Sequence, residues 1–305
     1  MKKVISAVLI AVLLLTTLCL PAFAEGTKTV AASFYPIYIL LRNVTDGVSG
    51  IDAVCLASEN TGCLHDYQLL PGDLISLSES DALFICGAGM ETYLGTVSKN
   101  FPELSVIDTS EGVELIEESR EEHEGEGGDE HEHEANAHIW LSVPNAIIMV
   151  KNIESAMCRI DSANAQKYSA NAQAYIARLE TLEEYIVAAL TPYAGRKIVT
   201  FHEAFPYFAE HYGIEVCEVV NIEHGDTISA MRLSEVIDAV ISNGLPPLFT
   251  EPQYSDSAAK IVASETGAGI FELDPIVTGE FSLTAYEDGM RRNADALVSA
   301  FSEKN

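Results

Sequence analysis

Two groups of residues in this chain are suited to binding a metal ion. The first group lies in the stretch from 117 to 134, where ten carboxylates accompany the imidazoles of His123, His131 and His133. Imidazole and carboxylate together capture borderline divalent ions, with Zn²⁺ foremost. No apolar residue lies between Ile116 and Ala135, so the stretch predicts a solvated loop with a secondary metal site. A solubilising acidic loop with incidental histidines is the alternative.

The second group consists of four side chains, three of which follow predicted strands and one of which follows the acidic loop. They are His65, His138, His202 and Asp274. Their positions matter because open parallel sheets bind ligands beyond the carboxyl ends of their strands, and two-lobed proteins bind them between the lobes. Three imidazoles and one carboxylate suit a closed tetrahedral Zn²⁺ site with no position for an activated water. The set therefore predicts a protein that carries metal rather than one that uses it in catalysis.

Each of these side chains also fits a structural role when it is considered alone. His65 fits a loop histidine that caps a turn, and His202 fits a buried histidine bonded to backbone. Asp274 precedes a proline, as turn residues often do. Only the joint placement after strands in both halves of the chain favours the metal site.

Strand-like and helical segments alternate along the chain, which is typical of parallel sheets covered by helices. One alternation runs from residue 30 to 108 and a second from 197 to 272. Between them, residues 164–190 contain neither Gly nor Pro and repeat apolar side chains every three or four positions. One helix there would extend about 40 Å. We therefore expect an α/β fold of two lobes, each a parallel sheet covered by helices, joined by a long rigid helix.

The N-terminus has the composition of an export signal. Lysines at positions 2 and 3 precede an apolar run to residue 20, and Ala22-Phe23-Ala24 matches a cleavage site. We expect a signal peptide at 1–24, cleavage near Ala24, and a soluble protein in the periplasm or at the cell surface. An uncleaved membrane anchor is the alternative. Cys19 does not follow a small residue, which disfavours a lipid anchor.

After the signal, the expected division is an N-terminal lobe at 25–162 with the acidic loop at 117–136, a linking helix at 163–190, and a C-terminal lobe at 191–305. The formal net charge of −29 repels nucleic acid and anionic membrane and attracts cations. No CxxC spacing occurs, so a cysteine zinc site is not expected. Cys55 and Cys63 flank a short loop, where a disulfide and two free thiols are equally compatible with the spacing.

Six segments, spread over the mature chain, resemble the zinc- and manganese-binding solute-binding proteins of bacterial ABC uptake systems, the TroA-like family. The segments are ASFYPIY at 32–38, GCLHDYQLLPGDL at 62–74, AHIWLSVPNA at 137–146, VTFHEAFPYFAEHYGI at 199–214, FTEPQYS at 249–255 and ELDPI at 272–276. The resemblance implies metal ligands at His65, His138, His202 and Asp274. It also implies delivery of the metal to a membrane permease driven by an ATPase, and we expect a monomer. Leu70 and Ser142-Val143-Pro144 depart from the family pattern without touching an expected ligand.

The resemblance also bears on the choice of metal. Manganese carriers of the family tend to have a carboxylate as the third ligand, whereas zinc carriers tend to have a histidine and a His-rich acidic loop. His202 and the loop therefore favour Zn²⁺ over Mn²⁺, and the Irving–Williams order agrees for an imidazole-rich site. Glu203 fits a partner of the ligands, a substitute ligand or a surface residue. Glu251 is expected to orient the site, and His211 and His224 to be structural or exposed.

Three other functions remain open at this point. A secreted zinc hydrolase with Glu203 as its general base would lack the second histidine of an HExxH motif, because Ala204-Phe205-Pro206 follows. A surface adhesion or metal-buffering protein would depend on the acidic loop. A manganese or iron carrier would use the same fold. Removal of the loop distinguishes a carrier, which keeps tight stoichiometric binding, from a buffer, which loses most of its capacity.

Overall fold

The computed structural model describes residues 26–57, 62, 64–117, 135–221 and 228–303. The predicted signal peptide, His123, His131, His133, His224 and Cys63 lie outside these residues. The described cysteines form no disulfide with one another. Within the described residues, no helix combines the length and the apolar character needed to cross a bilayer.

Two four-stranded sheets form the framework, and all of their strands run parallel. The N-terminal sheet has the order β2-β1-β3-β4 and the C-terminal sheet the order β6-β5-β7-β8. The strands are β1 (Lys28–Ala32), β2 (Ile51–Cys55), β3 (Ala82–Ile85), β4 (Ser105–Asp108), β5 (Lys197–Thr200), β6 (Glu215–Val219), β7 (Leu248–Thr250) and β8 (Ile270–Glu272). The prediction of an α/β fold with two parallel sheets is confirmed.

Helices cover both sheets and join them. They are α2 (Tyr35–Thr45), α3 (Pro71–Ser78), α4 (Leu94–Asn100), α5 (Val143–Ile160), α6 (Ala165–Leu190), α7 (Pro206–Tyr212), α8 (Ala230–Ser242), α9 (Ser257–Thr266) and α10 (Ala285–Ser302). The helix predicted at 164–190 is present as α6. α5 is absent from the predicted elements, although its buried side chains also recur every three or four residues.

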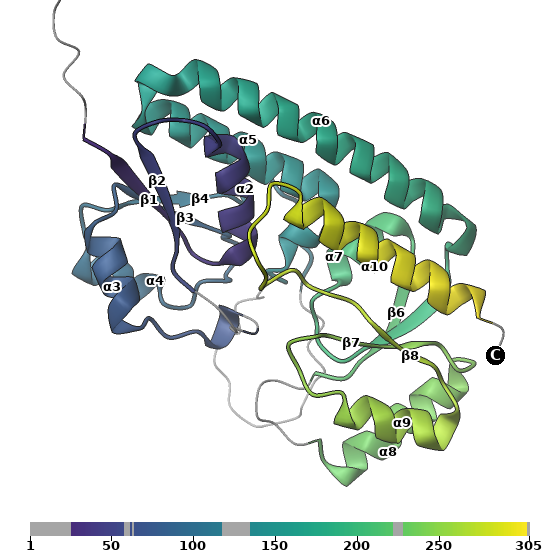
Figure 1. The fold of residues 1–305 in the computed structure, drawn as a ribbon. Helices are drawn as coiled ribbons and strands as arrows, with labels where there is room; N and C mark the ends of the chain where they lie inside the picture. The colour runs from purple at the N-terminus through teal and green to yellow at the C-terminus, as the bar shows by residue number, and fades with distance from the viewer. Residues whose placement is uncertain (1–25, 58–61, 63, 118–134, 222–227, 304–305) are drawn as a thin grey trace, which may run out of the picture.

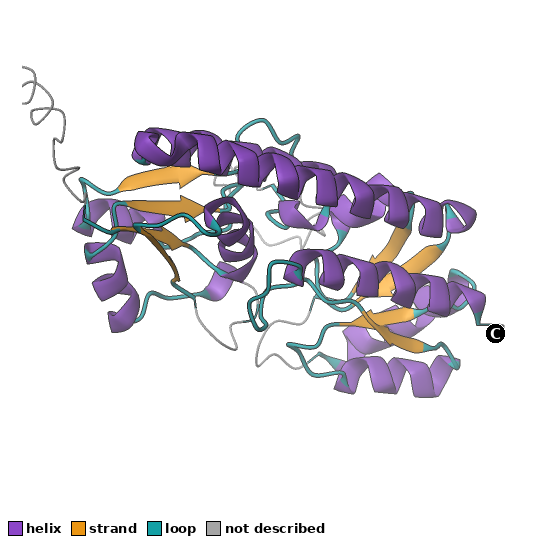
Figure 2. Cartoon of the chain, turned by 45° about the horizontal axis from the view of Figure 1, so that its top comes forward, coloured by secondary structure: helices purple, strands orange, loops and turns teal. Residues whose placement is uncertain are grey.

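α6 spans the whole molecule and packs against helices of both lobes (Figure 1). The two sheets lie beneath its opposite ends (Figure 2). Its buried face carries the apolar residues whose spacing predicted the helix, from Tyr168 to Leu190. Arg178 on α6 donates to Glu287 of α10 at 2.8 Å and also to Asn43 of α2. Because α2 packs beside the N-terminal sheet and α10 contacts β8 of the C-terminal sheet, this arginine ties elements next to both sheets to the same helix.

Candidate metal site

The three predicted imidazoles are carried by short turns where the lobes meet. His65 lies in the 3₁₀ turn Leu64–Asp66 beyond β2, and His138 immediately precedes the 3₁₀ turn Ile139–Leu141. His202 follows the end of β5 in the other lobe. In the order β6-β5-β7-β8, the chain adds β6 on one side of β5 and then β7 and β8 on the other side. The place between β5 and β7 is therefore a topological switch point, where open parallel sheets bind ligands.

The histidines from the two lobes lie side by side. The ring centroids of His65 and His138 are 5.6 Å apart, and those of His138 and His202 are 5.1 Å apart. Two imidazoles that bind one tetrahedral zinc ion through bonds of about 2.0 Å have centroids roughly 5 Å apart. The spacing of these rings therefore suits a shared ion. Within the part of the chain that the structure describes, no three donor side chains already surround a single point, so the side chains would have to rotate before they shared an ion.

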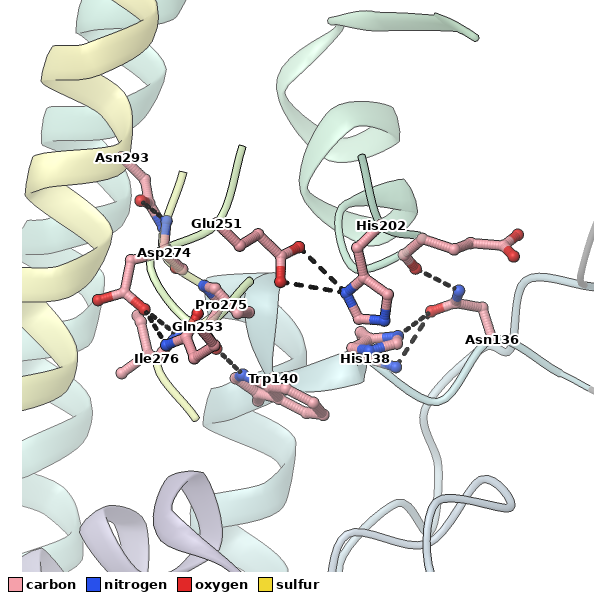
Figure 3. Close-up of polar contacts among 11 residues, drawn as sticks. Asn136, His138, Trp140, His202, Glu251, Gln253, Asp274, Pro275, Ile276 and Asn293 are labelled. Atoms are coloured by element: carbon pink, nitrogen blue, oxygen red, sulfur yellow. Dashed lines mark hydrogen bonds and ion pairs between the residues drawn. The ribbon is translucent and has the colours of Figure 1, made fainter. Parts of the chain in front are cut away.

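His202 is positioned by a buried carboxylate. Its Nδ1 lies 3.1 and 3.2 Å from the two carboxylate oxygens of Glu251, which follows β7 across the switch point (Figure 3). Both side chains are almost fully buried. An ionised carboxylate can only accept, so this contact places the ring proton on Nδ1 and the lone pair on Nε2. This is the partner arrangement that fixes the ring of many metal-binding histidines.

His138 is positioned by a side-chain amide. The Oδ1 of Asn136 accepts from the backbone N–H of His138 at 3.0 Å and lies 3.2 Å from its Nδ1. The amide Nδ2 of Asn136 donates to the carbonyl of Glu203 at 2.9 Å. Asn136 and His138 are both buried, at 1% and 2% exposure. The backbone carbonyl of Glu203 thus helps to hold Asn136 in place.

A buried carboxylate stabilises the loop after β3, which contacts the residue before His138. Glu91 accepts hydrogen bonds from the backbone N–H groups of Cys86 and Gly87 at 2.7 and 3.1 Å. The thiol of Cys86 contacts the carbonyl of Ala137, directly before His138. Burial raises the pKa of Glu91 from 4.5 to about 7. The loop next to His138, on what we call the histidine side of the site, is thus stabilised by a carboxyl group that is protonated near neutral pH.

Asp274, the fourth predicted ligand, is not in contact with the three histidines. Its Oδ1 accepts from the backbone N–H of Ile276 at 2.8 Å and from Gln253 at 3.3 Å. Its Oδ2 lies 3.8 Å from the guanidinium of Arg292. Figure 3 shows the carboxylate directed toward Gln253 and Ile276 and away from His202. For Asp274 to join a metal held by the imidazoles, its carboxylate would have to turn away from these partners.

Trp140 connects the histidine and aspartate sides of the site. Its ring lies 5.3 Å from that of His138. Its indole Nε1 donates to the carbonyl of Pro275 at 2.7 Å, and its own carbonyl accepts from the hydroxyl of Tyr286 at 2.6 Å. The residue that follows Asp274 is therefore bonded directly to the lobe that carries His138.

Comparison with protein families gives a match along nearly the whole chain. The model described as zinc-uptake complex component A, periplasmic (ZnuA), matches residues 30–300. The chain belongs to this family.

Individual relatives of this ZnuA-family chain carry both zinc and manganese in their names. The manganese-binding lipoprotein MntA of Halalkalibacterium halodurans is 27% identical over 284 residues, covering 92% of this chain and 90% of that protein. The high-affinity zinc uptake system protein ZnuA of Bacillus subtilis is 26% identical over 293 residues, covering 93% and 91%. The zinc-binding protein AdcA of Streptococcus pyogenes is 26% identical over 291 residues, and this chain spans 56% of its length.

Solved structures agree on the fold of this ZnuA-family chain. A crystal structure of ZnuA superposes with a TM-score of 0.76 at 25% identity, covering 91% of this chain and 100% of that one. FpvC of Pseudomonas aeruginosa, in complex with Mn²⁺, superposes with a TM-score of 0.79 at 26% identity, covering 90% and 98%.

Sequence reasoning did not identify Asn136 as a functional residue. The only signal was its type, a polar residue between the acidic loop and the apolar segment that follows His138. Glu251 was expected to orient the site, and its bond to His202 agrees with that role. The Nε2 of His211 lies 2.6 Å from a carboxylate oxygen of Glu183, a contact between α7 and α6.

Proposed function

We propose that this protein is the extracytoplasmic solute-binding component of a metal ABC importer. It binds Zn²⁺ where the lobes meet and delivers it to the membrane permease. The observation that carries the proposal is the side-by-side placement of His65, His138 and His202, drawn from both lobes. Membership in the zinc-uptake component family supports the same role. Asp274 is the proposed fourth ligand, and His123, His131 and His133 form the proposed secondary site.

Zinc is the proposed cargo because the site is dominated by nitrogen. An ion held by three imidazoles follows the Irving–Williams order, in which Zn²⁺ binds more tightly than Mn²⁺. Manganese remains the second candidate, since MntA and FpvC are named with that metal. If Asp274 and Glu251 supplied oxygen ligands in place of imidazoles, the preference would shift toward Mn²⁺.

The proposal also covers where the protein works and which proteins it contacts. Residues 1–24 act as a signal peptide that is removed near Ala24, and the mature protein works as a monomer in the periplasm or at the cell surface. Its lobes are residues 25–162 and 191–305, joined by the helix at 163–190. Its macromolecular partners are the permease and the ATPase that drives it. No catalytic step belongs to this role.

Calorimetric titration of the mature protein with Zn²⁺ and with Mn²⁺ tests the proposal. We expect one tight zinc equivalent that His202→Ala removes, with weaker binding left in the acidic loop. His211→Ala is the matched control, because that histidine lies outside the cluster, and it should leave the tight site intact. Tight zinc binding that survives His202→Ala would contradict the proposal and make the acidic loop the main site. Tighter binding of Mn²⁺ than of Zn²⁺ would support the second candidate.

A further inference from the structure

Asn136 holds a position that links the two lobes to a single metal-binding histidine. It lies at the stem of the acidic loop, where Glu117 and Ala135 form an antiparallel bridge and its own N–H donates to Ile116. Its side chain bonds on one side to His138 and on the other to the carbonyl of Glu203 (Figure 3). Every polar atom of this buried amide therefore has a role.

The backbone partners fix which way the amide faces. The N–H of His138 can only donate, so the atom of Asn136 that it meets at 3.0 Å must be the oxygen. The carbonyl of Glu203 can only accept, so the atom that it meets at 2.9 Å must be the nitrogen. His138 Nδ1, 3.2 Å from the same oxygen, must then be the donor. Two backbone groups thus assign the proton of this imidazole to Nδ1 and the lone pair to Nε2.

One of these backbone groups belongs to the other lobe. Glu203 follows β5 and directly adjoins His202. A second contact from the same lobe comes from Tyr207 of α7, whose hydroxyl donates to the carbonyl of Asn136 at 2.7 Å and accepts from the N–H of Ile116 at 3.0 Å. The residue that orients His138 is therefore held on both its side chain and its backbone by the C-terminal lobe.

We infer that Asn136 is a positioning residue that couples the orientation of His138 to contact between the lobes. The inference rests on the proposed function, because it assumes that His138 binds the cargo. While the lobes touch, Glu203 and Tyr207 hold the amide so that the lone pair of His138 Nε2 is presented to the metal. When a partner separates the lobes, both contacts are lost and the amide is free to turn. The cargo is then released without any partner touching a histidine.

The first test uses the metal-free protein and therefore does not depend on zinc binding. Long-range ¹H–¹⁵N spectra of imidazole-labelled protein report which ring nitrogen carries the proton, at a pH well above the ordinary imidazole pKa of about 6.5. His138→Ala identifies the signals of His138. We expect Nδ1–H in the wild type and in Asn136→Asp, which keeps the acceptor, and a mixture of tautomers in Asn136→Ala. An unchanged tautomer in Asn136→Ala would overturn the inference.

The second test measures coupling through zinc affinity. Asn136→Ala should weaken binding about 10- to 100-fold, as expected when a partner of a metal-binding histidine is lost. Tyr207→Phe keeps its ring and touches no imidazole, yet it should weaken binding several-fold. The double variant should bind no more weakly than Asn136→Ala alone, since the tyrosine acts through the asparagine. Unchanged affinity in Tyr207→Phe, or strictly multiplicative losses, would contradict the coupling. If the wild type bound no zinc tightly, or His138→Ala bound it unchanged, the proposed function would fail instead.

Discussion

The partners of His138 and His202 bond to Nδ1 of each ring, whereas the partners of Asp274 bond to the carboxylate that the proposed metal would need. Each imidazole bonds through Nδ1 to a buried acceptor, Asn136 or Glu251, and so presents Nε2. Asp274 instead accepts from the backbone of Ile276 and faces Arg292. The two sides of the proposed site therefore differ in how much must change when the ion arrives.

The backbone of the turn that holds Asp274 also restricts how that residue can move. Ile276 adopts a φ of +60°, which is strained for a β-branched residue. Gly289 of α10 makes room for it, because a Cβ atom there would lie 2.7 Å from the Ile276 side chain. The turn that holds Asp274 is thus supported by the neighbouring helix. We therefore expect the imidazoles to capture the metal first and the carboxylate to join only at a cost in free energy.

The largest expected effect is on zinc affinity, and it should differ between substitutions of the histidines and of Asp274. A structural zinc ion bound by four ligands contributes about 10–16 kcal/mol, so removing one histidine should cost about 3 kcal/mol, or roughly 100-fold in affinity. We expect His65→Ala and His138→Ala to show this loss, and Asp274→Ala to lose less than about 10-fold. Competition titration against a chelator of known affinity measures all three. An Asp274→Ala loss as large as that of a histidine would show that the sides are equivalent.

A second prediction concerns the loop that supports the histidine side. Because burial raises the pKa of Glu91 from 4.5 to about 7, the folded state favours the protonated form. The stability that this provides is full below pH 4.5 and is lost as the pH rises through 7. The free energy of unfolding of the wild type, relative to Glu91→Gln, should therefore fall by about 3 kcal/mol across that range.

Urea unfolding of both proteins in the presence of a chelator measures this difference. The other carboxylates are common to both proteins, so their titration cancels in the comparison. A difference that does not vary between pH 4.5 and 7.5 would show that Glu91 ionises normally. Glu91 would then not make the stability of the loop next to His138 depend on pH in this range.

A third prediction addresses the partner of His202. Glu251→Gln keeps the shape of the side chain but replaces a carboxylate acceptor by an amide, which holds the imidazole less firmly. Zinc affinity should fall about 10- to 100-fold while the stoichiometry stays at one, as is usual for such partners. Glu235→Gln, on the exposed face of α8, is the matched control. A complete loss of zinc would instead identify Glu251 as a ligand.

The smallest expected effect comes from removing the attraction between Arg292 and Asp274. Arg292 is 64% exposed, so its attraction to Asp274 is screened by water and is worth at most about 1 kcal/mol. Arg292→Met should therefore tighten zinc binding, by less than about 5-fold. The same substitution at Arg291, which instead stacks on Tyr185, should have no effect. Weaker zinc binding in Arg292→Met would mean that the arginine supports the site rather than competing with the metal.

The order of strands and helices could be predicted from the sequence because local spacing determines it. The apolar run of β3 and the three-and-four spacing of α6 are complete within their own segments. The three histidines could be selected as candidate ligands, since each follows a predicted strand or the acidic loop. α5 carries a similar spacing and could have been predicted on the same grounds.

The arrangement of the site's partners could not be predicted in this way. Asn136 bonds to a carbonyl 67 residues away, and the contact exists only because two lobes meet. Arg292 faces Asp274 because α10 packs beside the end of β8, which no local pattern encodes. Sequence spacing thus predicts the candidate ligands, whereas packing between lobes decides how each ligand is held.

X-ray absorption at the zinc edge, on protein loaded with one equivalent of Zn²⁺, tests the central claim most directly. The account predicts four-coordinate zinc with three imidazole ligands at about 2.0 Å, and the loss of one imidazole in His202→Ala. His211→Ala should leave the spectrum unchanged. A spectrum dominated by oxygen ligands, or one that His202→Ala does not alter, would contradict a site built from His65, His138 and His202.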